Sequence, residues 1–467
     1  MDFDGGIFST RFGTGLPRTA SEARTPDEML AALGAADAIA QSYPVANFEY
    51  VRNRFKERAA YAELLKVNEP DLTQREIGRK ARRKYAFRSS NLDAFKAHMA
   101  RWVETNDPLR ERLMLFWADH FTVRGDNRYA GTEPFYLEDA IRPNLTGRFE
   151  DILVACVTHP IMVRYLDQHR STSPLSVLGR RDGGGLNENL AREVLELHSL
   201  GVDGPYTQND VRALAQLLAG LTVDQQHTTQ YSVRRAHPRP IHFLGRDYGS
   251  GLIKILGRDY GSGEPDFEEV LAVLRNLANH PATARHMARK LAVHFVSDDP
   301  SNALVDAIET RWRDSGGQLM DVYSALLTHP EAANATRAKI KQPFELIATS
   351  FKALGVRGQE IMDIPEKEIS GLAQWMVGLG QRWLRPQGPD GLPEESGAWI
   401  TPLGLSLRFH FMLKFLNAYE NRVEPRDVLE RGLGPLASRE LRFAIGAAES
   451  RADALALILV SPEFQRK

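Results

Sequence analysis

Residues 187–210 read NENLAREVLELHSLGVDGPYTQND, and this stretch decides what kind of fold the chain adopts. Leu190, Val194 and Leu197 recur at the spacing of one helix face, which predicts an amphipathic helix. Gly201 can supply the left-handed residue that ends such a helix. The last four residues, TQND, have the pattern of a capping box that opens a second helix. The sequence therefore predicts a helical hairpin.

The first helix of this hairpin carries many ionisable groups. Glu188, Arg192 and Glu196 lie one turn apart, so Arg192 can pair with a carboxylate on either side. An exposed ladder of this kind stabilises a helix by about 0.2–0.5 kcal/mol per pair and requires no function. However, Glu193 lies beside the apolar rows, and the three glycines at 183–185 favour a close approach of backbone to another group. Both interpretations, an exposed ladder and a functional site, stay open.

The overall composition is that of an ordinary globular chain. The 467 residues are 43% hydrophobic and 25% charged, and the formal net charge is −1. A charge this close to zero provides no global field for nucleic acid or for an anionic membrane. Cys156 is the single cysteine, which excludes an internal disulfide and a cysteine-based metal cage.

The N-terminal residues indicate where the chain resides. Residues 1–26 are polar and glycine-rich, without the basic segment and apolar core of a secretory signal. No apolar run approaches the roughly 20 residues of a membrane span. The sequence as given predicts a cytoplasmic location and no membrane span, and it leaves a periplasmic location open.

Helical patterns follow one another from residue 25 onward, and we predict a mainly α fold with a large multi-helix body. We divide it into an N-terminal helical segment (1–105), a core domain that carries the motif helices (106–330) and a C-terminal segment packed on that core (331–467). Three histidines precede a proline at an expected helix start, where we expect them to cap helices: His159, His280 and His329.

Two regions depart from the helical pattern. A repeated octapeptide, LGRDYGSG, flanks the isoleucine-rich residues 252–255, which predicts one small β-hairpin insertion around 230–263. Residues 385–399 are rich in glycine and proline and predict a long irregular loop. An ordered loop of this length is uncommon unless it covers something. The basic run from Arg79 to Arg88 has glutamates nearby and no aromatic ladder, so we interpret it as a solvated helix face and predict no nucleic-acid partner.

Several motifs resemble the bacterial family catalogued as domain of unknown function 1800, in the form of its shorter, proteobacterial members. They are RFG (11–13), FWADHF (116–121), NENLARE (187–193) through Gly201, YTQ (206–208) with Asp210, HPATA (280–284), KL (290–291) with HFV (294–296), and PDG (389–391) followed by Trp399. The resemblance covers nearly the whole chain and implies a mostly helical body. It also implies frequent association with a second uncharacterised family that resembles secreted sulfatases or phosphatases. It implies no known activity.

The resemblance also selects individual positions of this chain. The family pattern points to His120, Glu188, Asn189, Arg192, Glu193, Glu196, Tyr206 and Asp210. The chain departs from the pattern at residues 219–222, where members tend to have threonine, glycine and tryptophan. That departure puts an aromatic wall near the site in doubt.

The first functional hypothesis is a carboxylate-based hydrolase or lyase that acts on a glycan. Cleavage of a glycosidic bond needs two carboxyl groups, and Glu193 and Glu188 would be proton donor and base, with His120 assisting. The remaining candidates would bind substrate: Arg192, Asn189, Tyr206, Asp210, Trp117 and Trp399. We predict no metal and no cofactor for this hypothesis.

Two alternatives compete with it. A metal-dependent enzyme would combine His120, Glu193 and Glu196, with His198 or Asp119 as further ligands, but the spacing does not match the Glu-x-x-His pattern of helical metal sites. A non-catalytic helical partner of a secreted sulfatase- or phosphatase-like protein would use the same charged cluster as a buried structural network.

Overall fold

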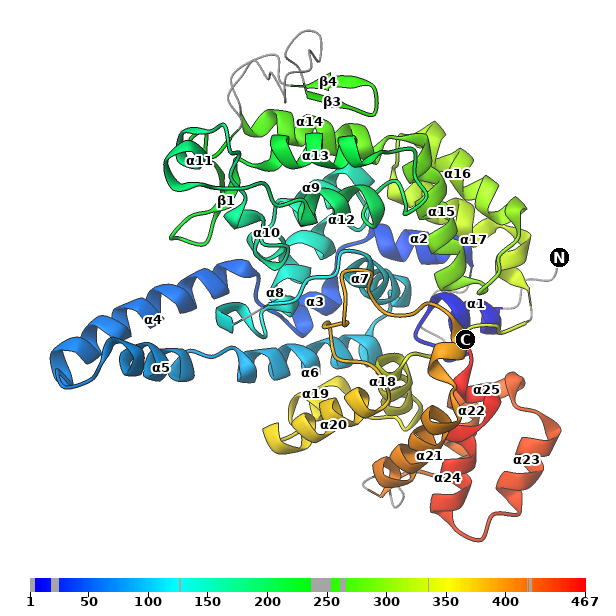
Figure 1. Cartoon of the computed structure of the whole chain (residues 1–467). Coiled ribbons are helices and arrows are strands. Elements are labelled where there is room, and N and C mark those ends of the chain that lie inside the picture. The colour runs from blue at the N-terminus through cyan, green and yellow to red at the C-terminus, as the bar shows by residue number, and fades with distance from the viewer. Residues whose placement is uncertain are drawn as a thin grey trace.

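The computed structural model describes residues 5–17, 25–125, 127–236, 253–260, 266–334, 336–417, 419 and 422–467. Within these residues the chain is mainly helical, which confirms the predicted fold class. The helices pack around two hydrophobic cores. Figure 1 shows that α4 and α5 project from the helical body on one side. The division of the chain into three domains stays a prediction.

The first core is formed mainly by the N-terminal and central helices. They are α1 (Gly5–Phe12), α2 (Pro26–Gly34), α4 (Phe48–Asn68), α7 (Pro108–His120), α8 (Glu133–Tyr136), α9 (Phe149–Val157), α10 (Pro160–Tyr165), α12 (Asn189–Glu196), α13 (Gln208–Leu218), α14 (Phe267–Ala278), α15 (Pro281–Phe295), α16 (Asn302–Ser315) and α17 (Leu319–Thr328).

The second core joins one early helix to the helices that follow residue 340. They are α6 (Arg88–Glu104), α18 (Pro343–Ala353), α19 (Gly358–Met362), α20 (Glu366–Gly378), α21 (Pro402–Leu416), α22 (Pro425–Gly432), α23 (Arg439–Gly446), α24 (Arg451–Val460) and α25 (Pro462–Gln465).

Short elements connect these helices. They are α3 (Ala38–Ser42), α5 (Gln74–Lys84), α11 (Val177–Asp182), the 3₁₀ turns η1 (Asn127–Tyr129), η3 (Arg142–Asn144), η4 (Gln168–Arg170), η5 (Pro330–Ala333), η6 (Ser396–Trp399) and η7 (Gly434–Leu436), and the π-helical turn η2 (Leu137–Ile141). No helix among the described residues has both the length and the apolar character needed to cross a membrane.

The three His-Pro pairs open helical segments as predicted. The imidazoles of His159, His280 and His329 accept hydrogen bonds from the backbone amide two residues later, at 3.2, 3.1 and 3.3 Å. Each of these contacts satisfies one of the amides that the first turn of a helix leaves without an intrahelical partner.

Two short antiparallel hairpins occur where one was predicted. The isoleucine-rich segment forms β3 (Ile253–Ile255), which pairs with β4 (Arg258–Tyr260). The other hairpin pairs β1 (Leu221–Val223) with β2 (Thr229–Tyr231). Its first strand begins at Leu221, shortly after the end of α13 and before the predicted range. The predicted range of 230–263 therefore covers one hairpin and only the last strand of the other, and most of the repeated octapeptides lie outside the described residues.

The long loop predicted around residues 385–399 is present. It connects α20 to α21, and the turn η6 is the one helical element within it. Its first half contains a tight turn with an isolated bridge between Gly388 and Gly391.

A buried ion-pair cluster links the two cores. Arg112 of α7 and Lys467 both pair with Glu345 of α18, and the Lys467 nitrogen lies 2.5 Å from the carboxylate. Burial alone would raise the pKa of Glu345, but the positive charges of Arg112 and Lys467 outweigh it and lower the pKa to about 2. The carboxylate is therefore ionised, and it holds two cations that would otherwise be buried without a partner.

Replacing Glu345 by Gln should destabilise the protein strongly. The substitution leaves Arg112 and Lys467 without a counter-charge, and breaking a buried pair in this way typically costs about 3–5 kcal/mol. Urea unfolding followed by circular dichroism measures the change. The control is Glu63→Gln, because Glu63 pairs with Lys66 on the surface at 2.7 Å, and such pairs contribute at most about 1 kcal/mol. Equal losses in the two variants would contradict the structural role of Glu345.

Candidate active site

The acidic helix that the sequence singled out is α12, and it is shorter than predicted. It ends at Glu196, because the His198 amide donates to the Glu193 carbonyl, five residues back, at 2.9 Å. Gly201 has a φ of +92° and so provides the predicted left-handed residue. The apolar face of α12 is buried in the first core, which leaves its charged groups on the remaining flanks.

The three glycines before α12 have a structural explanation. Gly183 ends α11 with a φ of +72°, a conformation that favours glycine. A Cβ atom on Gly184 would lie 2.9 Å from the Cβ atom of Thr172, so only glycine fits there. The close approach that the sequence suggested is thus an approach to Thr172 within the chain.

Glu188, Arg192 and Glu196 form a ladder on the outer flank of α12. Arg192 lies 3.1 Å from Glu188 and 3.2 Å from Glu196, and all three side chains are partly exposed. Gln208 donates to Glu188 at 2.8 Å, and Arg212 lies 3.5 Å from the other carboxylate oxygen. This network ties α12 to α13 and occupies the carboxylate of Glu188.

Three further predicted residues lie around this hairpin. Asn189 is exposed at the start of α12. Tyr206 donates its hydroxyl to the carbonyl of Val202 at 2.9 Å. Asp210 completes the predicted capping box of α13 and also accepts a hydrogen bond from the Leu256 amide at 2.9 Å, which anchors the β3–β4 hairpin. Capping and anchoring engage both carboxylate oxygens of Asp210.

His120 is buried where the end of α7 meets the segment after α12. Its Nε2 atom lies 3.4 Å from the carbonyl oxygen of His198, and the two rings are 6.1 Å apart. Burial, followed by the charge of Lys290, lowers the pKa of both histidines, that of His198 to about 3. Both imidazoles are therefore neutral near pH 7, and the two helices are neighbours.

The two tryptophans proposed to stack against a substrate are both buried. Trp117 lies in the first core and donates its indole N–H to Tyr323 at 2.8 Å. Trp399 donates to the Pro393 carbonyl at 3.0 Å within the long loop. Their faces therefore pack against protein, and a stacking role would need other aromatic side chains.

Glu193 differs from the ladder residues because it faces the long loop. It is half-buried, and no ion pair or hydrogen bond engages its carboxylate among the described residues. Burial raises the pKa of Glu193, and the negative charges of Glu196 and Asp390 raise it further, whereas Arg192 lowers it. Glu193 therefore releases its proton at a higher pH than an ordinary glutamate does.

Asp119, at the end of α7, is the group that the long loop covers. The Leu392 amide donates to its Oδ1 atom at 2.8 Å. Gly391 has a φ of +85°, and a Cβ atom there would lie 2.6 Å from the Oδ2 atom of Asp119. A glycine at this position is therefore required twice, by its backbone conformation and by the contact.

The pKa of Asp119 is raised to about 8. Burial is the main cause, the charges of Glu394 and Asp390 add to it, and Lys290 opposes it. A carboxylate in the last turn of a helix is further disfavoured by the helix dipole. By contrast, burial alone would raise the pKa of Glu394, but its contact with His294, 2.9 Å away, and the charges of nearby lysines lower that pKa to about 2.

We call Asp119, Tyr165, Glu193 and Asp390 the loop site. Tyr165 belongs to it because Glu193 and Asp390 raise the pKa of its hydroxyl, in addition to the larger effect of burial. The negative charge of Asp390 thus raises the pKa of Asp119 on one helix and of Glu193 on another, and clusters of carboxyl groups with raised pKa values are typical of acid–base sites.

Sequence reasoning found Glu193 but not the rest of this group. Asp119 was named only as a further ligand in the metal-dependent alternative, and Asp390 only as part of a motif. The signal was available in the motifs FWADHF and PDG, whose acidic residues meet in the structure. Among the described residues, no group of three or more His, Cys, Asp or Glu side chains is arranged to hold a metal ion.

The comparison with known families agrees with these motifs. The sequence profile of the family described as "Protein of unknown function (DUF1800)" matches residues 9–466. The chain belongs to the DUF1800 family. No curated protein and no solved structure is detectably similar to this DUF1800 chain.

Replacing Asp119 by Asn should stabilise the protein, increasingly so at higher pH. Because the pKa of Asp119 is raised from 3.8 to about 8, the native state holds a proton that the unfolded chain releases. The stability that this proton contributes is present at low pH and lost as the pH rises through 8. The gain at pH 8.5 should be at least about 1.4 kcal/mol, the equivalent of one unit of pKa shift.

Differential scanning calorimetry at pH 5 and pH 8.5 measures this gain. The exposed Asp314 provides a control, because Asp314→Asn should change stability little at either pH. A loss of stability in Asp119→Asn that is the same at both pH values would show that the carboxyl group is not protonated in the native state.

Proposed function

We propose that this DUF1800 chain is a carboxylate-based hydrolase or lyase that acts on a glycan, and that its acid–base chemistry takes place at the loop site. One observation carries the proposal: Asp390 is close enough to both Asp119 and Glu193 that its charge raises the pKa of each. Bringing like charges together costs stability, and this cost is typical of catalytic groups rather than of structural pairs.

Glu193 has the properties of the proton donor. Its raised pKa keeps a larger fraction of the carboxyl protonated near neutral pH, and its half-buried position leaves it open to a ligand. In glycoside hydrolysis this group would give its proton to the glycosidic oxygen as the bond from that oxygen to the anomeric carbon breaks.

Asp390 is suited to the second role. It is exposed at the turn of the loop, and it would accept a proton from the water whose oxygen bonds to the anomeric carbon. A separation of roughly 6.5–9.5 Å between the two carboxyl groups leaves room for that water, whereas about 5 Å would place Asp390 as a nucleophile. The sequence suggested Glu188 as the base. We assign this role to Asp390 instead, because two arginines and Gln208 already engage the carboxylate of Glu188.

A second function is supported by a different surface. Leu405, Phe409 and Leu413 are exposed at intervals of four residues, so they form an apolar stripe along α21. Exposed apolar helix faces are typical of protein interfaces. This stripe supports the alternative that the chain binds a sulfatase- or phosphatase-like protein without catalysing a reaction.

Glu193→Gln should abolish the proposed hydrolysis almost completely. Removing a general acid typically lowers kcat/KM by about 10²–10⁴-fold, and the alkaline limb of the pH profile should disappear with it. Release of reducing ends from a panel of neutral and acidic polysaccharides measures the activity.

The matched control is Glu188→Gln on the same helix. It removes the same charge from the ladder, and it should leave kcat/KM within about threefold of the wild-type value if Glu188 only positions α13. The reverse pattern, with activity lost in Glu188→Gln and kept in Glu193→Gln, would overturn the assignment of roles.

Phe409→Asp should weaken binding of a sulfatase- or phosphatase-like partner by at least about tenfold without lowering thermal stability, because the side chain is exposed. Co-purification of the two proteins, followed by sedimentation, tests this. The control is Lys414→Asp, which lies on the same helix outside the stripe. Unchanged binding in Phe409→Asp would exclude this surface.

A further inference from the structure

An arginine-lined cavity lies away from the loop site, where the projecting helices join the body. It has a volume of about 430 Å³ and is lined by residues of α4, of the junction between α5 and α6, of η1, of α20 and of the long loop. Small-molecule sites typically have volumes of roughly 300–1,000 Å³, so this cavity is large enough for a metabolite-sized ligand.

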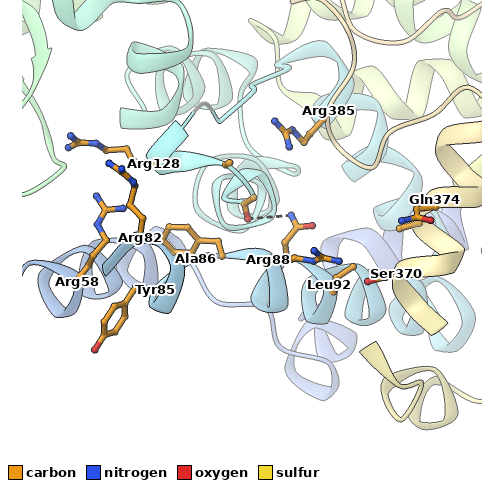
Figure 2. Close-up of a pocket in the computed structure, with 15 residues that line it drawn as sticks. Arg58, Arg82, Tyr85, Ala86, Arg88, Leu92, Arg128, Ser370, Gln374 and Arg385 are labelled. Atoms are coloured by element: carbon orange, nitrogen blue, oxygen red, sulfur yellow. Dashed lines mark hydrogen bonds between the residues drawn. The ribbon is translucent and has the colours of Figure 1, made fainter. Parts of the chain in front are cut away.

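Three guanidinium groups form one wall of this cavity. Figure 2 shows Arg58, Arg82 and Arg128 grouped at one side, although they come from three different elements. Among the described residues, no acidic side chain forms an ion pair with any of them. Burial lowers the pKa of Arg58, and the charges of Arg128 and Arg82 lower it further. The three cations therefore repel one another, and an anion placed between them would relieve that repulsion.

The opposite wall adds two more arginines and several uncharged polar groups. Arg88 lies at the start of α6, and Arg385 lies at the start of the long loop (Figure 2). Arg385 pairs with the buried Glu133 at 3.1 Å, so its charge is already matched. Ser370 and Gln374 of α20 provide a hydroxyl and an amide that can donate or accept hydrogen bonds.

The simpler interpretation is a solvated basic helix face, as the sequence suggested for the run from Arg79 to Arg88. Two facts argue against it for this cavity. Of that run's basic residues, only Arg82 and Arg88 line the cavity, and the others point elsewhere. The other arginines of the cavity, Arg58, Arg128 and Arg385, belong to other elements. The cavity is therefore not the exposed face of a single helix.

The charge and the donor geometry indicate the class of ligand. A guanidinium group presents paired N–H donors that match the oxygens of a phosphate. A phosphate monoester carries a charge of about −1.5 to −2 at neutral pH, and a diphosphate carries more. The three arginines of this wall, Arg58, Arg82 and Arg128, therefore balance a phosphate or diphosphate better than a sulfate ester or a single carboxylate, each of which carries one charge.

We propose that this cavity binds a small phosphorylated ligand through Arg58, Arg82 and Arg128, with the uncharged groups of α20 in contact with the rest of the molecule. This function is separate from the loop site and does not depend on the proposed hydrolysis. The ligand's source is a free inorganic phosphate or diphosphate, or the phosphate groups of an organic metabolite.

Isothermal titration calorimetry of the full chain with pyrophosphate, ADP and sulfate tests the proposal. Pyrophosphate and ADP should bind at least about tenfold more tightly than sulfate, and more weakly as the salt concentration increases. A tighter constant for ADP than for pyrophosphate assigns an organic ligand, and equal constants assign recognition of the phosphates alone. Absence of binding by both phosphates, or sulfate binding as tight as theirs, would overturn the proposal.

Arg82→Ala/Arg128→Ala should weaken pyrophosphate binding by about tenfold or more, because it removes two of the three positive charges of the wall that Arg58, Arg82 and Arg128 form. Both side chains are exposed, so the variant should keep its wild-type melting temperature. The matched control, Arg79→Ala/Arg83→Ala, removes two exposed charges from α5 that do not line the cavity, and it should bind within about twofold of wild type. Equal weakening in both variants would show that general surface charge, and not the cavity, binds the anion.

Discussion

Helix α7 is enclosed by protein along most of its length, and every charged side chain on it must be matched inside the molecule. Arg110 pairs with Asp107, Glu111 with Arg142, and Arg112 with Glu345. Because an unmatched buried charge is costly, these pairs fix where the neighbouring elements can lie. The pair with Glu345 is the most consequential, since it connects the helix of the first core to the second core. Asp119, on the same helix, is the exception: no cation in the described part of the chain forms an ion pair with it, and burial raises its pKa to about 8.

The fold class could be predicted from the sequence because helix periodicity and helix ends are local signals. The capping box around Asp210 and the left-handed Gly201 appear where the sequence predicted them. The end of α12 was missed, because a hydrogen bond from His198 to a carbonyl five residues back has no sequence signature. The hairpin β1–β2 was missed for a related reason, since a strand of three residues cannot be distinguished from the end of an apolar helix.

The residues of the loop site could be predicted from the sequence only in part. The position of Glu193 beside the apolar rows correctly distinguished it from the exposed ladder of Glu188 and Arg192. The glycines at 183–185 suggested a close approach to another group, but the one close contact among them is that of Gly184 with Thr172 of the same chain. Contacts between distant segments decide the rest: Asp119 and Asp390 lie about 270 residues apart in sequence, and no periodicity connects them. The arginine cavity is equally non-local, since Arg58, Arg82 and Arg128 come from three different elements.

The contact between Gly391 and Asp119 has a consequence for how this chain can vary. A methyl group at residue 391 would collide with both the carboxylate and the carbonyl of residue 119. The two positions therefore cannot be exchanged independently, and a larger residue in the turn is tolerated only if the helix end loses atoms at the same time. Transplanting the turn into another scaffold would require moving the last residues of α7 with it. The turn and the helix end are thus a single interlocking part, although they are encoded far apart.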